Sequence, residues 1–341
     1  LHAPLAHAAL GSGKHVVVEK PLTGCFVRRD ERTPGEMLEH AVAEADGLVA
    51  AADAAQRRCF YAENWVYAPP VAKARALLAE AGGTVLRIQG EESHSGTHSE
   101  PNKHWITAGG GALFGKGCHP LGAALHLKGR APKSVIAHTA SLTNVGEQTH
   151  LRTGYEDVED WGLLVCEFDD GTVAEIVGAD TTLGGVRNVL RVYASNVVVE
   201  ANLNPNSAVR AYAPDADVLA AAYLSEKLET HAGWSSPSPD EDWMQGYPQE
   251  IQDFAECVVT GRAPLSDARL GRDVKYGLGV IVRATALGPA WGHSGFFPGY
   301  ATEMLYFPAT RVAVAVQVNR TDPYPRGLVP FLVEVARVAG R

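Results

Sequence analysis

The feature that most constrains the fold is a short apolar run, HVVVE (15–19), which lies between two helical segments. A run of β-branched residues without polar alternation is typical of a strand buried on both faces of a parallel sheet. Residues 3–13 predict a helix before this strand and residues 34–58 a helix after it, while 59–65 and 70–81 predict a second strand and a third helix. This β-α-β-α order indicates an α/β fold with a doubly wound sheet, of which this segment supplies two strands, fewer than such sheets normally contain.

The next part of the chain changes to closely spaced strands. Asp169-Asp170-Gly171 joins two of them as a hairpin turn, and a helix is expected near 119–128. Further helices are expected near 215–229 and at 250–260. We therefore expect an α+β domain with a largely antiparallel sheet that has helices on one face. The predicted strands are 84–92, 134–142, 161–168, 172–180, 189–194 and 197–200.

The charge balance argues against a nucleic-acid or acidic-membrane partner. The chain has 30 basic and 39 acidic residues, whereas such partners require a basic surface. No apolar run reaches the roughly 18 residues of a membrane-spanning helix. The cysteines are odd in number and form no C-x-x-C, so we expect no disulfide framework, no structural zinc and a reducing, cytoplasmic location. They are Cys25, Cys59, Cys118, Cys166 and Cys257.

The string HAPLAHAALGSGKHVVVEKPL (2–22) resembles the glucose–fructose oxidoreductase and inositol dehydrogenase (Gfo/Idh/MocA) family. The resemblance implies that Glu19, Lys20 and Pro21 close the nicotinamide half of an NAD or NADP site, with Lys20 reaching the substrate hydroxyl. A lysine at the carboxyl end of a parallel strand lies where doubly wound sheets bind ligands. Such a lysine can hold an alkoxide or transfer a proton. The alternative is a solvated loop lysine.

A second string, GGGALFGKGCHPLGAALHLK (109–128), resembles the same family. The resemblance implies that His119 accepts or donates the proton of the substrate hydroxyl. Gly115 stands where the family has an aspartate, and Gly122 replaces a second acidic residue, so we expect His119 to lack the carboxylate that would orient its ring. Lys116 is adjacent and is a candidate substrate contact. The alternative for His119 is a helix histidine that is satisfied by a backbone carbonyl.

Three histidines follow the first predicted strand of the second domain, in ESHSGTHSEPNKHW (92–105). His94 and His98 have a spacing that could bind zinc on a helix, but Gly96 and Pro101 indicate a loop, so we expect no metal. Similar loops line the substrate site in some family members. We therefore interpret His98 as substrate-lining and place Trp105 near the rim of the same cleft, with a solvated loop as the alternative.

Neither phosphate-binding motif is complete in this sequence. Residues 110–116 begin like a Walker A loop, but Gly117 replaces the Ser or Thr that binds magnesium. The dinucleotide fingerprint G-x-G-x-x-G is absent, and Gly11-Ser12-Gly13 follows a helix and precedes a strand, which is the reverse of the required order. We therefore expect this chain to bind NAD(H) or NADP(H) weakly.

The tail resembles a different class. Residues 276–308 and 312–319 are similar to the closing half of serine β-lactamases and penicillin-binding proteins, with His293-Ser294-Gly295 in place of Lys-Thr-Gly. That chemistry requires a nucleophile in Ser-x-x-Lys, and no serine of this sequence has lysine three residues later. An H-S-G strand without a nucleophile cannot acylate.

Taken with the resemblances, the sequence predicts three parts. Residues 1–82 are expected to be the C-terminal part of a Rossmann-like dinucleotide-binding domain, 83–273 an α+β substrate and oligomerisation domain, and 274–341 a short α/β hydrolase-like tail. The predicted function is NAD(P)-dependent oxidation of a sugar, cyclitol or related polyol, impaired by a missing N-terminal half, in a possible homo-oligomer formed through the antiparallel sheet. The alternatives are an inactive chimeric or scaffold protein and a serine hydrolase remnant.

Overall fold

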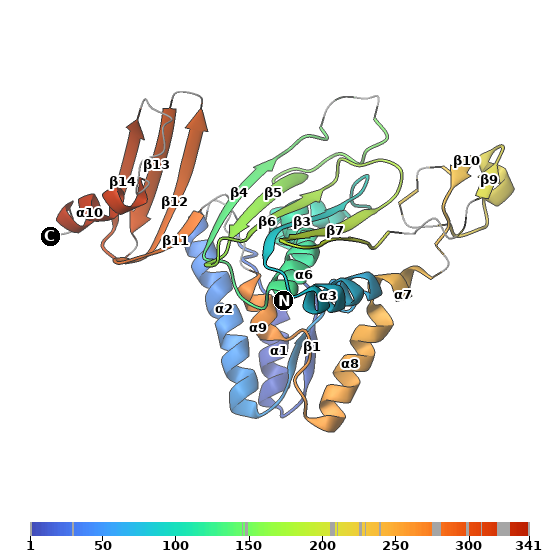
Figure 1. Ribbon diagram of the computed structural model, residues 1–341, viewed down its shortest axis with the longest axis horizontal. Coiled ribbons are helices and arrows are strands. Elements are labelled where there is room, and N and C mark those ends of the chain that lie inside the picture. The colour runs from blue at the N-terminus through green and yellow to red at the C-terminus, as the bar shows by residue number, and fades with distance from the viewer. Residues whose placement is uncertain are drawn as a thin grey trace.

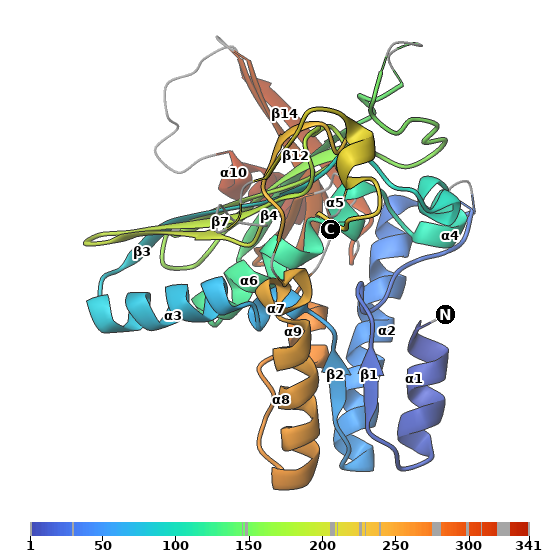
Figure 2. The same cartoon turned by 90° about the vertical axis from the view of Figure 1, so that its right-hand side faces the viewer.

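The computed structural model describes residues 2–28, 31–144, 146, 149–204, 209, 211–224, 227–228, 230–238, 240–274, 281–297, 300–307, 309–318 and 328–339. Figure 1 shows a broad mixed sheet in the middle of the molecule, a helical layer beneath it, and a second antiparallel sheet at one side. Figure 2 shows α3 and α6 under the broad sheet, with α1, α2 and α8 around the short strands β1 and β2.

The elements follow the predicted order with few changes. The main helices are α1 (His2–Gly11), α2 (Pro34–Ala55), α3 (Pro69–Ala81), α4 (Trp105–Ala108), α5 (Ala112–Gly115), α6 (Cys118–Lys128), α7 (Glu241–Gln245), α8 (Tyr247–Thr260), α9 (Ala268–Asp273) and α10 (Val329–Ala339). The strands are β1 (Val16–Val18), β2 (Cys59–Tyr61), β3 (Val85–Ser93), β4 (Ser134–Ala140), β5 (Trp161–Glu167), β6 (Val173–Ala179), β7 (Arg187–Ala194), β8 (Val198–Asn202), β9 (Ala211–Ala213), β10 (Gly233–Ser235), β11 (Ile281–Thr285), β12 (Gly288–Phe297), β13 (Tyr300–Phe307) and β14 (Val312–Val318).

The first two strands form the predicted parallel pair. Val16, Val17 and Val18 of β1 lie opposite the three residues of β2. The expectation that this strand is buried on both faces is wrong, because Val17 is 50% exposed. Its other face packs on α1 and α2 through a core that contains Val18 and Leu48.

The broad sheet has the strand order β4-β5-β6-β3-β7-β8. All pairs are antiparallel except β3 and β6, so the predicted largely antiparallel sheet is present as a mixed sheet. Helix α6 lies directly on β3, where a Cβ added at Gly90 would come within 2.6 Å of Cβ of Pro120. This close approach requires glycine and places the start of α6 over the middle of the sheet.

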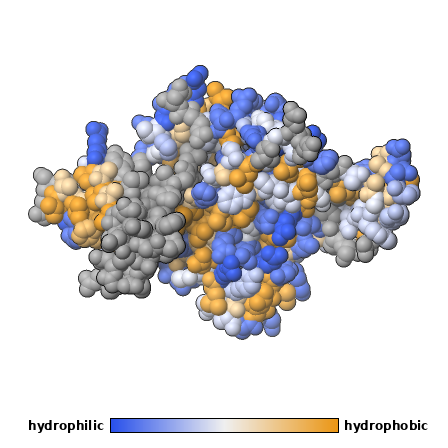
Figure 3. Space-filling model, turned by 90° about the horizontal axis from the view of Figure 1, so that it is seen from above, coloured by the Kyte–Doolittle hydropathy of each residue, from blue (hydrophilic) through white to orange (hydrophobic). Residues whose placement is uncertain are grey.

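The opposite face of the sheet combines ion pairs with apolar side chains such as Val177 and Val189, the register partners of Glu91. Arg87 on β3 contacts Glu175 on β6 at 2.6 Å, and Arg187 on β7 contacts Glu91 on β3 at 3.0 Å. Figure 3, which views this side from above, shows polar and apolar residues intermixed on the described surface. Oligomerisation through this sheet stays a prediction.

Two parts of the C-terminal half differ from expectation. The helix expected near 215–229 is, in the described residues, a single 3-10 turn at Ala216–Leu219. Leu224 is buried, but Val218 and Tyr223 are exposed, so a longer helix would have little core to pack against, and helix propensity alone rarely holds a short helix. Strand β12 was expected only around His293-Ser294-Gly295, because its other glycines and its proline hide the rest of its β pattern.

The tail forms a four-stranded antiparallel sheet, β11-β12-β13-β14, with α10 packed on it. Its core contains Leu305, Phe307 and Leu332, each fully buried. Within the described residues, no helix has both the length and the apolar character needed to cross a bilayer. All five cysteines are free and buried.

Candidate active site

A cavity of about 800 Å³ lies where the carboxyl ends of β1 and β2 meet the start of α6 and the underside of the broad sheet. Crevices at the carboxyl ends of parallel strands are the usual ligand sites of such sheets. Most of the charged and polar side chains considered below line it: Lys20, Glu92, Lys116, His119, Asp180 and Asn188.

Lys20 follows β1 and is held at the cavity by a backbone contact. Its Nζ donates to the carbonyl oxygen of Gly115 at 2.6 Å. Burial lowers the pKa of Lys20, but its interactions with the acidic groups of Cys118, Glu92, Glu63 and Glu19 outweigh this and leave the pKa above its usual value. Lys20 is therefore an ammonium at neutral pH, fixed at the cavity wall.

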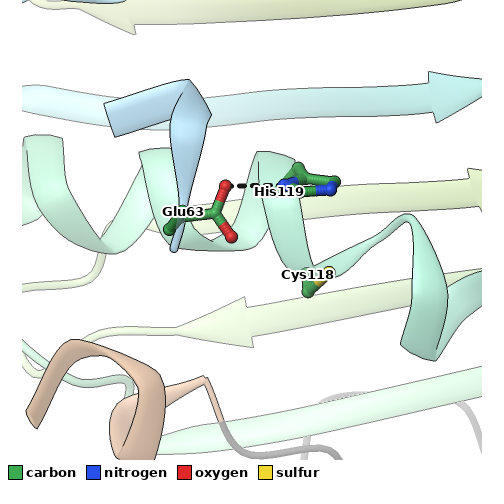
Figure 4. Close-up of side chains that lie close together, drawn as sticks. All are labelled: Glu63, Cys118 and His119. Carbon is green, nitrogen blue, oxygen red and sulfur yellow. Dashed lines mark hydrogen bonds and ion pairs between the residues drawn. The ribbon is translucent and has the colours of Figure 1, made fainter. Parts of the chain in front are cut away.

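His119 is held by a carboxylate from another element. Figure 4 shows Glu63, two residues after β2, against the imidazole ring, with 2.7 Å between Glu63 Oε1 and His119 Nδ1. Both side chains are buried. The expectation that His119 lacks an orienting carboxylate is therefore wrong. The carboxylate does not come from α6; it comes from Glu63, in the segment that directly follows β2.

Gly122 makes room for this arrangement. A Cβ at Gly122 would lie 2.7 Å from Cγ and 2.9 Å from Cδ of Glu63. At Gly115, by contrast, a Cβ would meet nothing within 4 Å. The glycine that appeared to remove an acidic residue from α6 thus creates the space in which Glu63 reaches His119.

The electrostatics favour a neutral ring at neutral pH. Burial, and next the positive charge of Lys20, lower the pKa of His119 to about 4, although Glu92 opposes this shift. Burial also raises the pKa of Glu63 well above its usual value, against the opposing effect of Lys20. The indole of Trp65 is parallel to the imidazole, with ring centroids 6.3 Å apart. Since Glu63 occupies Nδ1, Nε2 is the ring nitrogen that can serve a ligand.

Glu63, Cys118 and His119 are also a set that could hold a metal ion. One ligand atom from each lies within 4.8 Å of the other two, and all three residues are buried (Figure 4). Burial raises the pKa of the Cys118 thiol to about 12, while Lys20 lowers it. A metal would have to displace the thiol proton and compete with the Lys20 ammonium. The absence of a metal stays a prediction.

The other end of the cavity carries residues that the sequence reasoning missed. Lys116 Nζ lies 2.8 Å from Asp180 Oδ1. Tyr155 accepts a hydrogen bond from the N–H of Thr97 at 3.0 Å, and burial together with Asp180 raises its pKa. Asp180 directly follows β6, whose end lies beside that of β3 in the parallel pair. Lys20 was predicted as a site residue because it follows the carboxyl end of a parallel strand. The same criterion would have identified Asp180 and Glu63.

The predicted site residues are only partly brought together. Lys20, Pro21, Lys116 and His119 line the cavity, and so does His94. The lining does not include Glu19, His98 or Trp105. Trp105 is instead buried in a separate apolar cluster, and its backbone N–H donates to Oδ1 of Asp157 at 2.6 Å. The assigned chemical roles of all these residues stay predictions.

A Gly122→Ala change should separate Glu63 from His119. The added methyl group occupies the position of the Glu63 side chain, so we expect turnover to fall roughly tenfold, as for the loss of partners that orient a functional histidine. Nitrogen NMR of the imidazole should report a changed Nδ1 environment. If the methyl acts through Glu63, adding Gly122→Ala to Glu63→Ala should cost nothing further; full additivity of the two changes would contradict the argument.

The region that forms the broad sheet is similar to a known protein family. Residues 71–200, from α3 to β8, match the family model described as the GFO/IDH/MocA C-terminal domain. A search of curated proteins finds no match.

Solved structures of similar fold include GenD2 from gentamicin A biosynthesis, in complex with NAD (26% identity, TM-score 0.66, covering 80% of this chain and 70% of that one). A putative myo-inositol dehydrogenase from Sinorhizobium meliloti 1021 has 16% identity and a TM-score of 0.58, over 80% and 72% of the two chains. The WlbA dehydrogenase from Bordetella pertussis, in complex with NADH and UDP-GlcNAcA, has 16% identity and a TM-score of 0.52, over 80% and 70%.

These matches give no support to the hydrolase resemblance of 274–341. The structural matches support the mixed α/β architecture of this chain, and the family match covers the region that forms the broad sheet. The chain is therefore similar, over residues 71–200, to the GFO/IDH/MocA C-terminal domain, and this stretch carries His119 and the sheet above it.

Proposed function

We propose that the protein is an NAD(P)-dependent oxidoreductase that transfers hydride between nicotinamide and a carbinol carbon of a sugar, cyclitol or related polyol. The observation that carries this proposal is the convergence of the Lys20 ammonium and the Glu63-held His119 on one cavity. The NAD complex of GenD2, at 26% identity, supports the cofactor class.

The residues present fit the nicotinamide end of such a cofactor. The cavity adjoins the carboxyl ends of two parallel strands, where Lys20 and Pro21 form part of its wall. When bound, the cofactor supplies the hydride acceptor. The sequence of this chain has no glycine-rich turn for a pyrophosphate, so we expect binding to require high cofactor concentrations.

The side chains divide the proton and charge handling between them. Lys20 donates a hydrogen bond to the substrate oxygen and stabilises the negative charge that develops there. His119 Nε2, neutral at pH 7, accepts the hydroxyl proton. Glu63 holds Nδ1 and stabilises the imidazolium that forms.

The test is nicotinamide reduction by the purified chain. With millimolar NAD⁺ or NADP⁺ and a panel of myo-inositol, D-glucose and related polyols, we expect slow growth of the reduced-nicotinamide absorbance with at least one substrate. Lys20→Met should abolish it, whereas Lys14→Met, an exposed lysine before the same strand, should not. No reduction with any polyol and either cofactor, by a chain that unfolds cooperatively, would refute the proposal.

A further inference from the structure

Two acceptor oxygens in the sheet above the cavity have no hydrogen-bond donor. They are Oε2 of Glu92 and Oδ1 of Asn188, both buried, and no residue in the described part of the chain donates to either. Both residues line the cavity, and Asn188 is only 3% exposed. Neither residue has a role in the proton handling proposed above.

The two residues are direct neighbours across the sheet. Glu92 on β3 is the register partner of Asn188 on the antiparallel strand β7. Register partners point to the same face, with Cβ atoms about 4.5–5.5 Å apart. Gly90, two residues before Glu92, faces α6, so strand alternation directs this pair to the same side, beside His119.

Glu92 carries a buried carboxyl with cationic side chains in its surroundings. Burial raises the pKa of its carboxyl, and the positive charges of Lys20 and Lys116 are among the effects that oppose the rise. A buried acceptor without a donor costs free energy, so such groups are uncommon in native proteins and need an explanation. What these two oxygens lack is therefore a hydrogen-bond donor.

We propose that Glu92 and Asn188 accept hydrogen bonds from two neighbouring hydroxyl groups of the substrate ring, beside the carbon handled by Lys20 and His119. This inference rests on the proposed function and deepens it, because it makes a vicinal diol part of the recognised substrate. A carboxylate or phosphate in this position has no hydrogen to donate. Sites built to bond a hydroxyl discriminate strongly against analogues that lack it.

The test is the dissociation constant of myo-inositol and D-glucose, from saturation-transfer difference NMR titrations of the whole chain without cofactor. Glu92→Met should weaken binding roughly 10- to 100-fold and Asn188→Leu roughly 3- to 10-fold, the ranges expected for bonds to a charged and a neutral acceptor. Glu92→Gln keeps the shape of the side chain and should also weaken binding. The matched control is Glu91→Gln, on the opposite face of β3, which should change the constant less than about twofold.

Each outcome bears on a different claim. If the wild-type chain binds a polyol and the Glu92 and Asn188 variants, folded by circular dichroism, bind equally well, the assignment of this pair is wrong while the proposed function stands. If the wild-type chain binds neither polyol, the proposed substrate class fails, and this inference with it. If 2-amino-2-deoxy-D-glucose binds more than tenfold tighter than D-glucose, and Glu92→Gln removes the difference, the partner is an ammonium group and the diol is overturned.

Discussion

Replacing His119 with alanine should lower the rate of polyol oxidation by roughly 10²- to 10⁴-fold, the usual contribution of a positioned general base. The buried imidazole lines the cavity, has its Nδ1 held by Glu63 at 2.7 Å, and is the proton acceptor of the proposed reaction. Alanine leaves Lys20 in place, so substrate binding should change much less than turnover. The measurement is kcat from reduced-nicotinamide absorbance, with KM determined in parallel.

The pH profile provides the control for this prediction. Because burial and Lys20 hold the pKa of His119 near 4, the ring is neutral above about pH 5 and protonated below the pKa. Wild-type oxidation should therefore be independent of His119 titration at neutral pH and should fall as the pH decreases through about 4. An oxidation rate that rises as the pH decreases, or a His119→Ala chain as active as wild type, would contradict the assigned role.

The arrangement of strands and helices was largely predictable, because hydrophobic periodicity and turn residues are local signals. The valine run of β1 and the Asp-Asp-Gly turn between β5 and β6 each identify an element without tertiary information. Prediction from hydrophobic periodicity failed where the local sequence pattern does not match the burial of the side chains in the structure. The stretch after Asp215 has the composition of a helix but little core to pack on, while the glycines and the proline of β12 conceal how far that strand extends.

The site was harder to predict, because its central contact joins residues far apart in the sequence. Gly115 and Gly122 predicted a histidine without a carboxylate because the expected acidic positions were both on the helix of His119 itself. Glu63 lies between β2 and the 3-10 turn Asn64–Val66, and the packing of α6 against that turn brings it to His119. Hydrophobic periodicity predicts on which side of a helix or strand a residue lies. It does not predict which residue from a distant part of the sequence will contact it.

The largest stability effect is expected from Gly111→Ala, at the start of α5. A Cβ at this position would lie 1.8 Å from the backbone oxygen of Glu159. That oxygen accepts the N–H of Ala112 at 2.8 Å, and the Glu159 side chain accepts the N–H of Leu113 at 3.1 Å. Backbone cannot move aside as a flexible side chain can, so we expect a loss of about 3 kcal/mol or more in the free energy of unfolding.

Gly115→Ala, at the other end of the same four-residue helix, is the matched control. Its Cβ would meet nothing within 4 Å, so urea denaturation should show no loss, or a gain of at most about 1 kcal/mol from helix propensity. Gly111→Ala should also weaken polyol turnover at temperatures where the chain stays folded, because α5 carries the Gly115 carbonyl that accepts from Lys20. Equal denaturation midpoints for the two variants would show that the start of α5 can shift without cost, and would remove the argument that this helix fixes the position of Lys20.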